Sequence, residues 1–373
     1  MMPVFDAALG QGIELLHVRQ EAAAVHMADA HARLTGEVGI ALVTGGQGHT
    51  NAIAALPTAL AGEVPLVLLS GHAPLGELGL GAFQELAQAR MAEPVTKAAF
   101  TAQSAATLAQ DLARAVRIAR SGRPGPVHLS LPTDALDAVL DPAALRLPEA
   151  ADFAPVPMPL APETAAMVAA AAARAEPPLL IAPPALCTPS GRAAMAALSQ
   201  AAGLPLIPME SPRGVNDPSL GAFAEVLAKA DLVVLVGKQL DFTLKFGRAP
   251  VGAACRWIVL DPDAAMIGRA TKLHGARVIL AAQADAASSA AALAAAMAPH
   301  GNTAWAADVA AAIAYRPAAW DALAGTPDGP IHPATLCHAL RPHLAGDAVL
   351  VSDGGEIGQW AQALEGELNL KLF

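Results

Sequence analysis

The sequence predicts an α/β protein with two three-layer α/β/α domains, each built on a parallel sheet, followed by the beginning of a third α/β unit. Short apolar runs alternate with helical segments along the chain. The runs have few polar interruptions, which is typical of strands buried on both faces of a parallel sheet. A proline-rich segment without periodicity separates two such series. Because 54% of the 373 residues are hydrophobic and 15% are charged, the chain can fill two or three cores.

The first domain is expected over residues 1–140. Its apolar runs predict four strands, at 13–18, 38–46, 65–71 and 124–132. Helical patterns lie between the strands, at 19–36, 49–63 and 103–120. Gly36 is expected to end the first helix, since glycine is the usual residue just past a helix C-terminus.

Residues 141–162 are predicted to be a linker, because they are rich in proline and have no regular pattern. The central domain is expected over 163–315, with buried strands within 177–186, 203–209, 230–237, 255–261 and 276–281. A second break at 324–330 precedes a third unit over 331–373. That unit begins with a helical pattern at 331–344 and a strand at 348–355.

Composition excludes several classes of protein. The net charge is −10 and no basic stripe is present, so no nucleic-acid partner is expected. No uninterrupted apolar run is long enough to span a membrane, and the first residues lack the pattern of a signal peptide. The three cysteines are widely scattered, which disfavours a disulfide framework or a zinc site. A cytoplasmic protein is therefore expected.

Three predicted strand ends carry residues suited to ligand binding, because ligands in open parallel sheets bind beyond the carboxyl ends of the strands. Glu21 follows the first apolar run, residues 44–51 (TGGQGHTN) form a glycine-rich turn, and residues 353–356 (DGGE) form another. Each has a structural interpretation as well. Glu21 suits the start of a helix, the glycines suit a tight turn, and Asp353 suits a helix cap. Neither turn is a GxGxxG or Walker motif.

Four histidines, His17, His26, His31 and His49, lie close together in the sequence. Metal ligation by them is disfavoured, because no cysteine is nearby and no HExxH motif occurs. His26 and His31 are five residues apart, which places them on different faces of a helix. No metal ligand is therefore predicted in this chain.

Several motifs in order resemble the thiamine-diphosphate-dependent enzymes. The segment HVRQEAAAVHMADAHARLTG (17–36) resembles the one that carries the family's catalytic glutamate, and GGQGHTNAIAAL (45–56) resembles its GPG-x-x-N turn. Three later segments, VPLVLLSG, GAFQELAQARMAEPVTK and RPGPVHLSLPTD, match successive motifs. Within the family the chain is similar to acetolactate synthases and to the 2-hydroxyacyl-CoA lyase and oxalyl-CoA decarboxylase group. VGKQLDFTLKFG (236–247) is similar to a segment of the second group.

The resemblance implies a pyrimidine-binding domain, a central domain and the opening of a diphosphate-binding domain. It implies that the Glu21 carboxyl hydrogen-bonds N1′ of the aminopyrimidine of thiamine diphosphate, which favours an imino form that deprotonates C2. We expect a dry pocket around this carboxyl. The residues implied to line the pyrimidine are Thr44, Gly45, Gly46, Gln47 and Asn51. Phe83 and Gln84 would lie near the substrate, and the diphosphate cradle would begin at Gly354, Gly355, Glu356 and Ile357.

The implied reaction is carboligation or decarboxylation of a 2-keto acid in a homodimer or tetramer, with a carbon–carbon lyase acting on an acyl-CoA as the alternative. The chain begins after the family's opening strand and ends before the GDG...N motif that binds Mg²⁺ and the diphosphate. A truncated chain is therefore expected, and an inactive remnant or subunit is a further alternative. FAD or ADP in the central domain is a weaker expectation. Gly237 and Asp261 lie at strand ends there, although a structural role suits them better.

Overall fold

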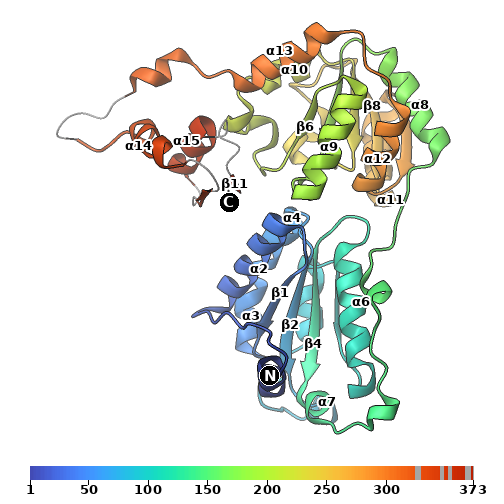
Figure 1. Cartoon of the computed structure of the whole chain (residues 1–373), viewed down its shortest axis with the longest axis vertical. Helices are drawn as coiled ribbons and strands as arrows, with labels where there is room; N and C mark the ends of the chain where they lie inside the picture. The colour runs from blue at the N-terminus through green and yellow to red at the C-terminus, as the bar shows by residue number, and fades with distance from the viewer. Residues whose placement is uncertain (324–328, 345–347, 352–354, 366–370, 373) are drawn as a thin grey trace. The chain divides into compact units, whose positions relative to one another are not determined.

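The computed structural model describes residues 1–323, 329–344, 348–351, 355–365 and 371–372. The chain divides into two compact units (Figure 1). The first unit comprises Met1–Pro157 with Thr188–Ser190, and the second comprises Met158–Cys187 with Gly191–Phe373. The predicted α/β class with parallel sheets is confirmed, since every strand pair described is parallel.

The first unit is built on a four-stranded sheet with strand order β1-β2-β4-β3. Its strands are β1 (Gly39–Val43), β2 (Leu66–His72), β3 (Ala98–Thr101) and β4 (Pro126–Pro132). Its helices are α1 (Met2–Gly10), α2 (Glu21–Thr35), α3 (Gln47–Ile53), α4 (Leu56–Ala61), α5 (Gln88–Ala92), α6 (Leu108–Arg120) and α7 (Thr133–Asp137).

Strand β2 shows why this unit has three layers. Leu66 and Leu68 belong to a core cluster with α2, α3 and α4, whereas Val67 and Leu69 belong to a second cluster with α6. Successive side chains of a strand point to opposite faces of its sheet. Helix α6 therefore covers the face opposite α2 and α3, as Figure 1 shows.

Helix α2 begins and ends where the sequence predicts. The side chain of Gln20 accepts a hydrogen bond from the Ala23 amide, and Gly36 ends the helix in the left-handed conformation, with φ of 78°. The helix then packs tightly on β1, because a Cβ at Gly39 would lie 2.1 Å from the carbonyl oxygen of Ala28. Only glycine permits this approach of helix to strand.

Two features of the first unit differ from the sequence prediction. The predicted strand at 13–18 is wrong: these residues form no strand, and Ile13 and Leu16 are exposed. An apolar run becomes a strand only where a partner strand accepts its hydrogen bonds, and none pairs with this segment in the described structure. The sequence also missed β3, a short edge strand whose residues are all half-buried. It therefore lacks the fully buried pattern used to find the others.

The second unit is built on a five-stranded sheet with order β6-β5-β7-β8-β9. All five strands lie within the predicted runs or overlap them: β5 (Pro178–Ala182), β6 (Leu206–Pro208), β7 (Leu232–Val236), β8 (Arg256–Asp261) and β9 (Val278–Gln283). Its helices are α8 (Pro162–Ala173), α9 (Pro189–Ala202), α10 (Phe223–Lys229), α11 (Ala264–His274), α12 (Ala286–Ala296) and α13 (Thr303–Ala314).

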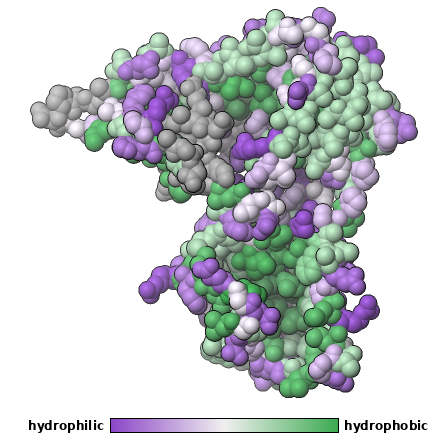
Figure 2. Space-filling view, in the orientation of Figure 1, coloured by the Kyte–Doolittle hydropathy of each residue, from purple (hydrophilic) through white to green (hydrophobic). Residues whose placement is uncertain are grey.

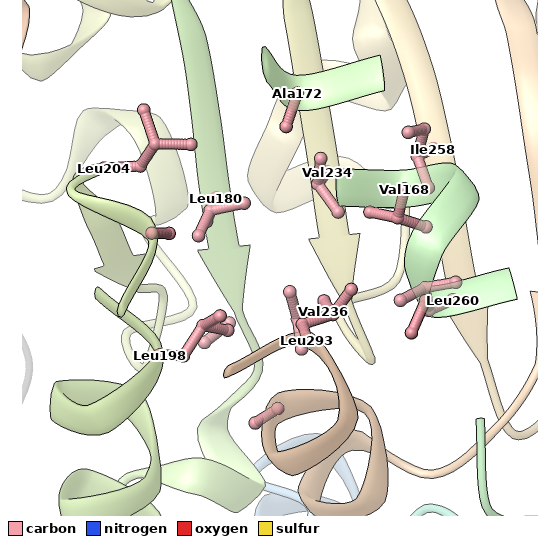
Figure 3. Close-up of a cluster of buried hydrophobic side chains, with 14 of the residues drawn as sticks. Val168, Ala172, Leu180, Leu198, Leu204, Val234, Val236, Ile258, Leu260 and Leu293 are labelled. Atoms are coloured by element: carbon pink, nitrogen blue, oxygen red, sulfur yellow. The ribbon is translucent and has the colours of Figure 1, made fainter. Parts of the chain in front are cut away.

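The core of this unit lies on both faces of its sheet. Val234, Val236 and Leu260 pack with α8, α9 and α12 (Figure 3), whereas Val233 and Leu235 pack with α10, α11 and α13. The alternation along β7 shows that both of its faces are covered. This explains why β7 (LVVLV) is a continuous apolar run rather than an alternating one.

The residues after 330 form a small cluster that is grouped with the second unit. Helix α14 (Pro333–Leu340) and helix α15 (Glu356–Glu365) pack through Ala334, Cys337, Ala361 and Leu364, and the rings of Trp320 and Trp360 lie edge to face. The strand predicted at 348–355 is described only as β10 (Val349–Leu350), which pairs with β11 (Lys371–Leu372). None of the helices formed by described residues has the length and apolarity that crossing a membrane requires.

The approach of α2 to β1 yields a stability prediction. Gly39→Ala should lower the free energy of unfolding by about 1–3 kcal/mol, because the added methyl group collides with the Ala28 carbonyl and must displace the helix. Chemical denaturation measures the change. Gly76→Ala is the matched control in the same unit, since a Cβ there meets no atom within 4 Å. Equal stability of the two variants would contradict the prediction.

Candidate functional site

The first candidate residues meet where α2 and α3 begin. The Nδ2 of Asn51 donates a hydrogen bond to Oε2 of Glu21, at 3.0 Å. Glu21 is the first residue of α2 and Asn51 lies one turn into α3, 30 residues further along the chain. The fold therefore brings together a half-buried carboxylate and an amide that the sequence places far apart.

The glycines between Thr44 and Asn51 are required by close packing. A Cβ at Gly48 would lie 2.5 Å from Cγ2 of Thr44 and 3.2 Å from Oε1 of Glu21. A Cβ at Gly45 would lie 2.5 Å from the carbonyl oxygen of Gly71, at the end of β2. Gly46 has φ of 63°, a left-handed conformation that favours glycine. The turn thus packs against the sheet, and Gly48, which has no side chain, lies close to the half-buried Glu21 carboxylate.

Gln88 fastens this turn to the sheet, and sequence reasoning missed it. Its Oε1 accepts a hydrogen bond from the Gly46 amide at 2.9 Å. Its Nε2 donates to the Gly71 carbonyl and to Oγ of Ser130, both at 3.0 Å. The side chain is fully buried. Gln88 lies within the segment that matches a family motif, but a polar residue in a sequence does not reveal that it is buried.

His49 and His128 form a buried pair beneath the turn. Nδ1 of His49 lies 2.9 Å from Oγ of Ser70, and its Nε2 lies 3.1 Å from the carbonyl oxygen of Gln88. The two imidazole rings are 4.5 Å apart between centroids. Burial lowers the pKa of His49 to about 4. Burial, reinforced by the neighbouring His49 and His72, lowers the pKa of His128 to about 3.

Both imidazoles are therefore neutral near pH 7, and each nitrogen of His49 already has a hydrogen-bond partner. His26 and His31 are exposed on α2, away from this pair. Across the described ranges, no group of three or more His, Cys, Asp or Glu side chains is placed to hold a metal ion.

The predicted substrate residues lie on a loop beside the turn. Gln84 has φ of 57°, and its Cβ would be 2.8 Å from a Cβ added at Gly46, so the loop packs directly on the glycine turn. The neighbouring Phe83 side chain is 86% exposed. Hydrophobic residues also gather elsewhere on the visible face of this unit, as Figure 2 shows. Phe83 is thus free to contact a ligand or another chain.

Glu85 holds this loop in shape. Its carboxylate accepts hydrogen bonds from the amides of Gly79 (2.6 Å), Gly81 (3.2 Å) and Ala82 (3.1 Å). The bond from Gly79, followed by those from the other two amides, lowers the pKa of Glu85. The ionised carboxylate therefore fixes the loop that presents Phe83.

The remaining predicted residues lie in the second unit or outside the described residues. Gly354 falls outside them. Gly355 has φ of 90°, Glu356 begins α15 and accepts a hydrogen bond from Nε1 of Trp360 at 3.2 Å, and Ile357 is 40% exposed. Glu356 and Ile357 are thus the first two residues of α15, and Gly355 directly precedes them.

Gly237 and Asp261, at the strand ends of the central sheet, have structural contacts. The Gly237 amide donates to the Leu260 carbonyl, and a Cβ at Gly237 would lie 2.5 Å from Cβ of Ala286. The Asp261 carboxylate is buried and accepts a hydrogen bond from the Asp263 amide at 2.8 Å. Both residues thus hold the ends of the sheet to α12 and to the start of α11.

The family match lies within the first unit. Residues 1–91 match the family described as thiamine pyrophosphate enzyme, N-terminal TPP binding domain. The chain is 48% identical over 139 residues to acetolactate synthase isozyme 3 large subunit of Escherichia coli (strain K12), which covers 37% of this chain and 24% of the synthase. It is 35% identical over 153 residues to a probable acetolactate synthase large subunit of Methanocaldococcus jannaschii. This alignment covers 41% of this chain and 26% of the relative.

One similarity extends further along the chain. The sequence is 32% identical over 272 residues to oxalyl-CoA decarboxylase of Escherichia coli (strain K12), which covers 70% of this chain and 48% of the decarboxylase. The chain therefore spans between about a quarter and about a half of the length of these relatives.

The buried histidines yield a pH prediction. Below pH 6.5 the unfolded chain binds a proton on each imidazole, whereas the folded chain does so only near pH 4 for His49 and pH 3 for His128. Their contribution to stability is thus complete above pH 6.5 and is lost as the pH falls. The expected loss is on the order of 1 kcal/mol per pH unit for each histidine.

Denaturation of the wild type and of His128→Gln between pH 7 and pH 4 measures this effect. The variant should lose less stability on acidification than the wild type. His26→Gln is the matched control, because His26 is exposed and its removal should leave the acid profile unchanged. If the free energy of unfolding fell equally with pH in the wild type and in His128→Gln, His128 would not be a cause of the loss of stability in acid.

Proposed function

We propose that this chain, which belongs through its N-terminal domain to the thiamine-diphosphate-dependent enzymes, holds the aminopyrimidine ring of thiamine diphosphate against Glu21. In this proposal residues 1–140 are the pyrimidine-binding domain, 163–315 the central domain and 331–373 the opening of the diphosphate-binding domain. The observation that carries it is the contact between Glu21 and Asn51, which sets a half-buried carboxylate beside the glycine turn.

The residues present fit a flat heteroaromatic ring. One oxygen of the Glu21 carboxylate accepts the Asn51 amide, and the other faces the side of the turn where Gly48 has no side chain. The carboxyl can therefore hold a proton at a ring nitrogen while Asn51 fixes its orientation. We propose that the turn from Thr44 to Gln47 lines the ring. Thr44 and Gln47 are exposed there, whereas Gly45 and Gly46 pack against the Gly71 carbonyl and Gln84.

Glu21 is half-buried in the first unit. The dry surroundings that proton exchange needs would be completed by the bound ring and by a second subunit, in the homodimer or tetramer implied by the family. When bound, thiamine diphosphate supplies the electron sink for making or breaking a carbon–carbon bond next to a carbonyl group. The protein's part is to hold the proton at Glu21, orient the ring and exclude water.

We propose a 2-keto acid as the substrate, as in the acetolactate-synthase-like interpretation of the motifs. A second candidate is decarboxylation or cleavage of an acyl-CoA. It is favoured by the match to oxalyl-CoA decarboxylase, which covers 70% of this chain and so reaches beyond the first unit. In either case we propose that Phe83 and Gln84 face the substrate.

The remaining cofactor assignments rest on the family. Mg²⁺ would accompany the diphosphate group, for which we propose a cradle beginning at Gly354, Gly355, Glu356 and Ile357. FAD or ADP in the central domain stays a prediction. The structural contacts of Gly237 and Asp261 do not support it.

The role of Glu21 can be tested apart from cofactor binding. The dissociation constant of Glu21→Gln for thiamine diphosphate with Mg²⁺, measured by calorimetry, should stay within a few-fold of the wild-type value. It should slow exchange of the cofactor's C2 proton with solvent deuterium by on the order of 100-fold, since the proton-holding carboxyl is gone. Nuclear magnetic resonance of the bound cofactor measures the exchange.

Glu37→Gln is the matched control, because Glu37 is exposed just past the end of α2 and the charge change is the same. Equal exchange rates in Glu21→Gln and the wild type would overturn the assignment. Absence of cofactor binding in the wild type would instead favour the alternative of an inactive remnant.

The substrate class is tested by supplying the loaded chain with pyruvate or with oxalyl-CoA and measuring the CO₂ released. Release from pyruvate alone supports the 2-keto acid, and release from oxalyl-CoA alone supports the second candidate. Phe83→Ala should slow the productive reaction more than Leu9→Ala, a control that removes another highly exposed apolar side chain, from α1.

A further inference from the structure

A cavity of about 440 Å³ opens on the first unit, over α6. Part of its wall comes from α6 and from the turn before it, and part from the irregular segment that follows α7. Its lining residues are Ala106, Thr107, Gln110, Ala113, Arg114, Arg117, Arg146 and Asp152. Because α6 covers the sheet face opposite α2 and α3, this cavity is separate from the Glu21 site.

Three arginines are among the residues that line this cavity. In the described part of the chain, none of Arg114, Arg117 and Arg146 forms an ion pair with a carboxylate. Asp152 is the one carboxylate among the described lining residues, and its Oδ2 accepts a hydrogen bond from the Glu149 amide at 2.9 Å. The cavity is thus strongly positive in a protein whose net charge is −10.

The guanidinium of Arg114 is also held in place. Its Cζ lies 4.6 Å from the centroid of the Phe100 ring, in a cation–π contact that uses the face of the group and leaves its N–H donors available. Arg117 lies one turn further along α6 and is half-buried. Arg114 and Arg146 are exposed, so a ligand can reach them from solvent, and donors held in place lose less freedom on binding than mobile ones.

Gln110 joins the two walls of the cavity. Its Nε2 donates a hydrogen bond to the Arg146 carbonyl, which ties the irregular segment to α6. The segment that carries Arg146 is thus held against the helix that carries Arg114 and Arg117.

We propose that this cavity binds a small molecule through a phosphate group. A phosphate oxygen pair accepts two parallel hydrogen bonds from one guanidinium, and arginine is the residue best suited to this contact. The cavity volume suits a ligand of metabolite size.

Titration of the full chain with inorganic phosphate and with glycerol 3-phosphate tests this, with thermal stabilisation as the readout. The reference is sodium chloride at the same ionic strength. Both Arg117→Gln and Arg146→Gln should raise the phosphate concentration needed for half-maximal stabilisation about tenfold. This corresponds to a loss of about 1.4 kcal/mol in binding free energy. Arg146 lies outside any α-helix. The Arg146→Gln variant therefore tests the site even if Arg117→Gln, which changes α6, disturbs folding.

Arg269→Gln is the matched control, because Arg269 is exposed on a helix of the second unit and its loss changes the net charge equally. Saturable stabilisation that both cavity variants weaken and the control does not supports the proposal. Preference for one probe distinguishes a site for free phosphate from a site for a phosphate ester. The proposal would be overturned if sodium chloride gave the same stabilisation, or if Arg117→Gln, Arg146→Gln and Arg269→Gln all kept the wild-type response to phosphate. Glu21→Gln should leave this binding unchanged, which separates it from the proposed cofactor site.

Discussion

The close approach of the glycine turn to the end of β2 is the constraint on which the first unit depends. Gly45 lies so near the Gly71 carbonyl that a Cβ would sit 2.5 Å from its oxygen. Gln88 then joins the turn to the ends of β2 and β4 through three buried hydrogen bonds. Because α3 starts from this turn and packs beside α2, the contact between Asn51 and Glu21 follows from it.

Burial of polar groups beneath the turn adds a second constraint. The imidazole of His49 is fixed at both nitrogens, by Ser70 and by the Gln88 carbonyl. Such a network orders the site only while the imidazoles stay neutral, because a buried charge without a partner is costly. The same residues thus shape the turn and limit the pH range in which it keeps that shape.

The two faces of the first sheet differ in their electrostatics. On one face a single carboxylate, Glu21, stands at a turn held by neutral side chains. On the other, Arg114 and Arg117 of α6 and Arg146 of the segment after α7 line a cavity. A parallel sheet covered by helices on both sides permits this difference in charge. Each helical layer is solvated on its outer surface, so its surface residues can differ from those of the other layer.

The sequence by itself determined the fold class, the positions of nine strands or parts of them, and the motif that contains Glu21. Continuous apolar runs such as Leu232–Val236, short and rich in valine, favour strands buried on both faces of a sheet. Tertiary structure decided the rest. It left residues 13–18 without a strand, because pairing needs a partner that local sequence does not specify. It also buried Gln88 and His128, since hydrogen bonds across 42 residues depend on the packing of separate elements.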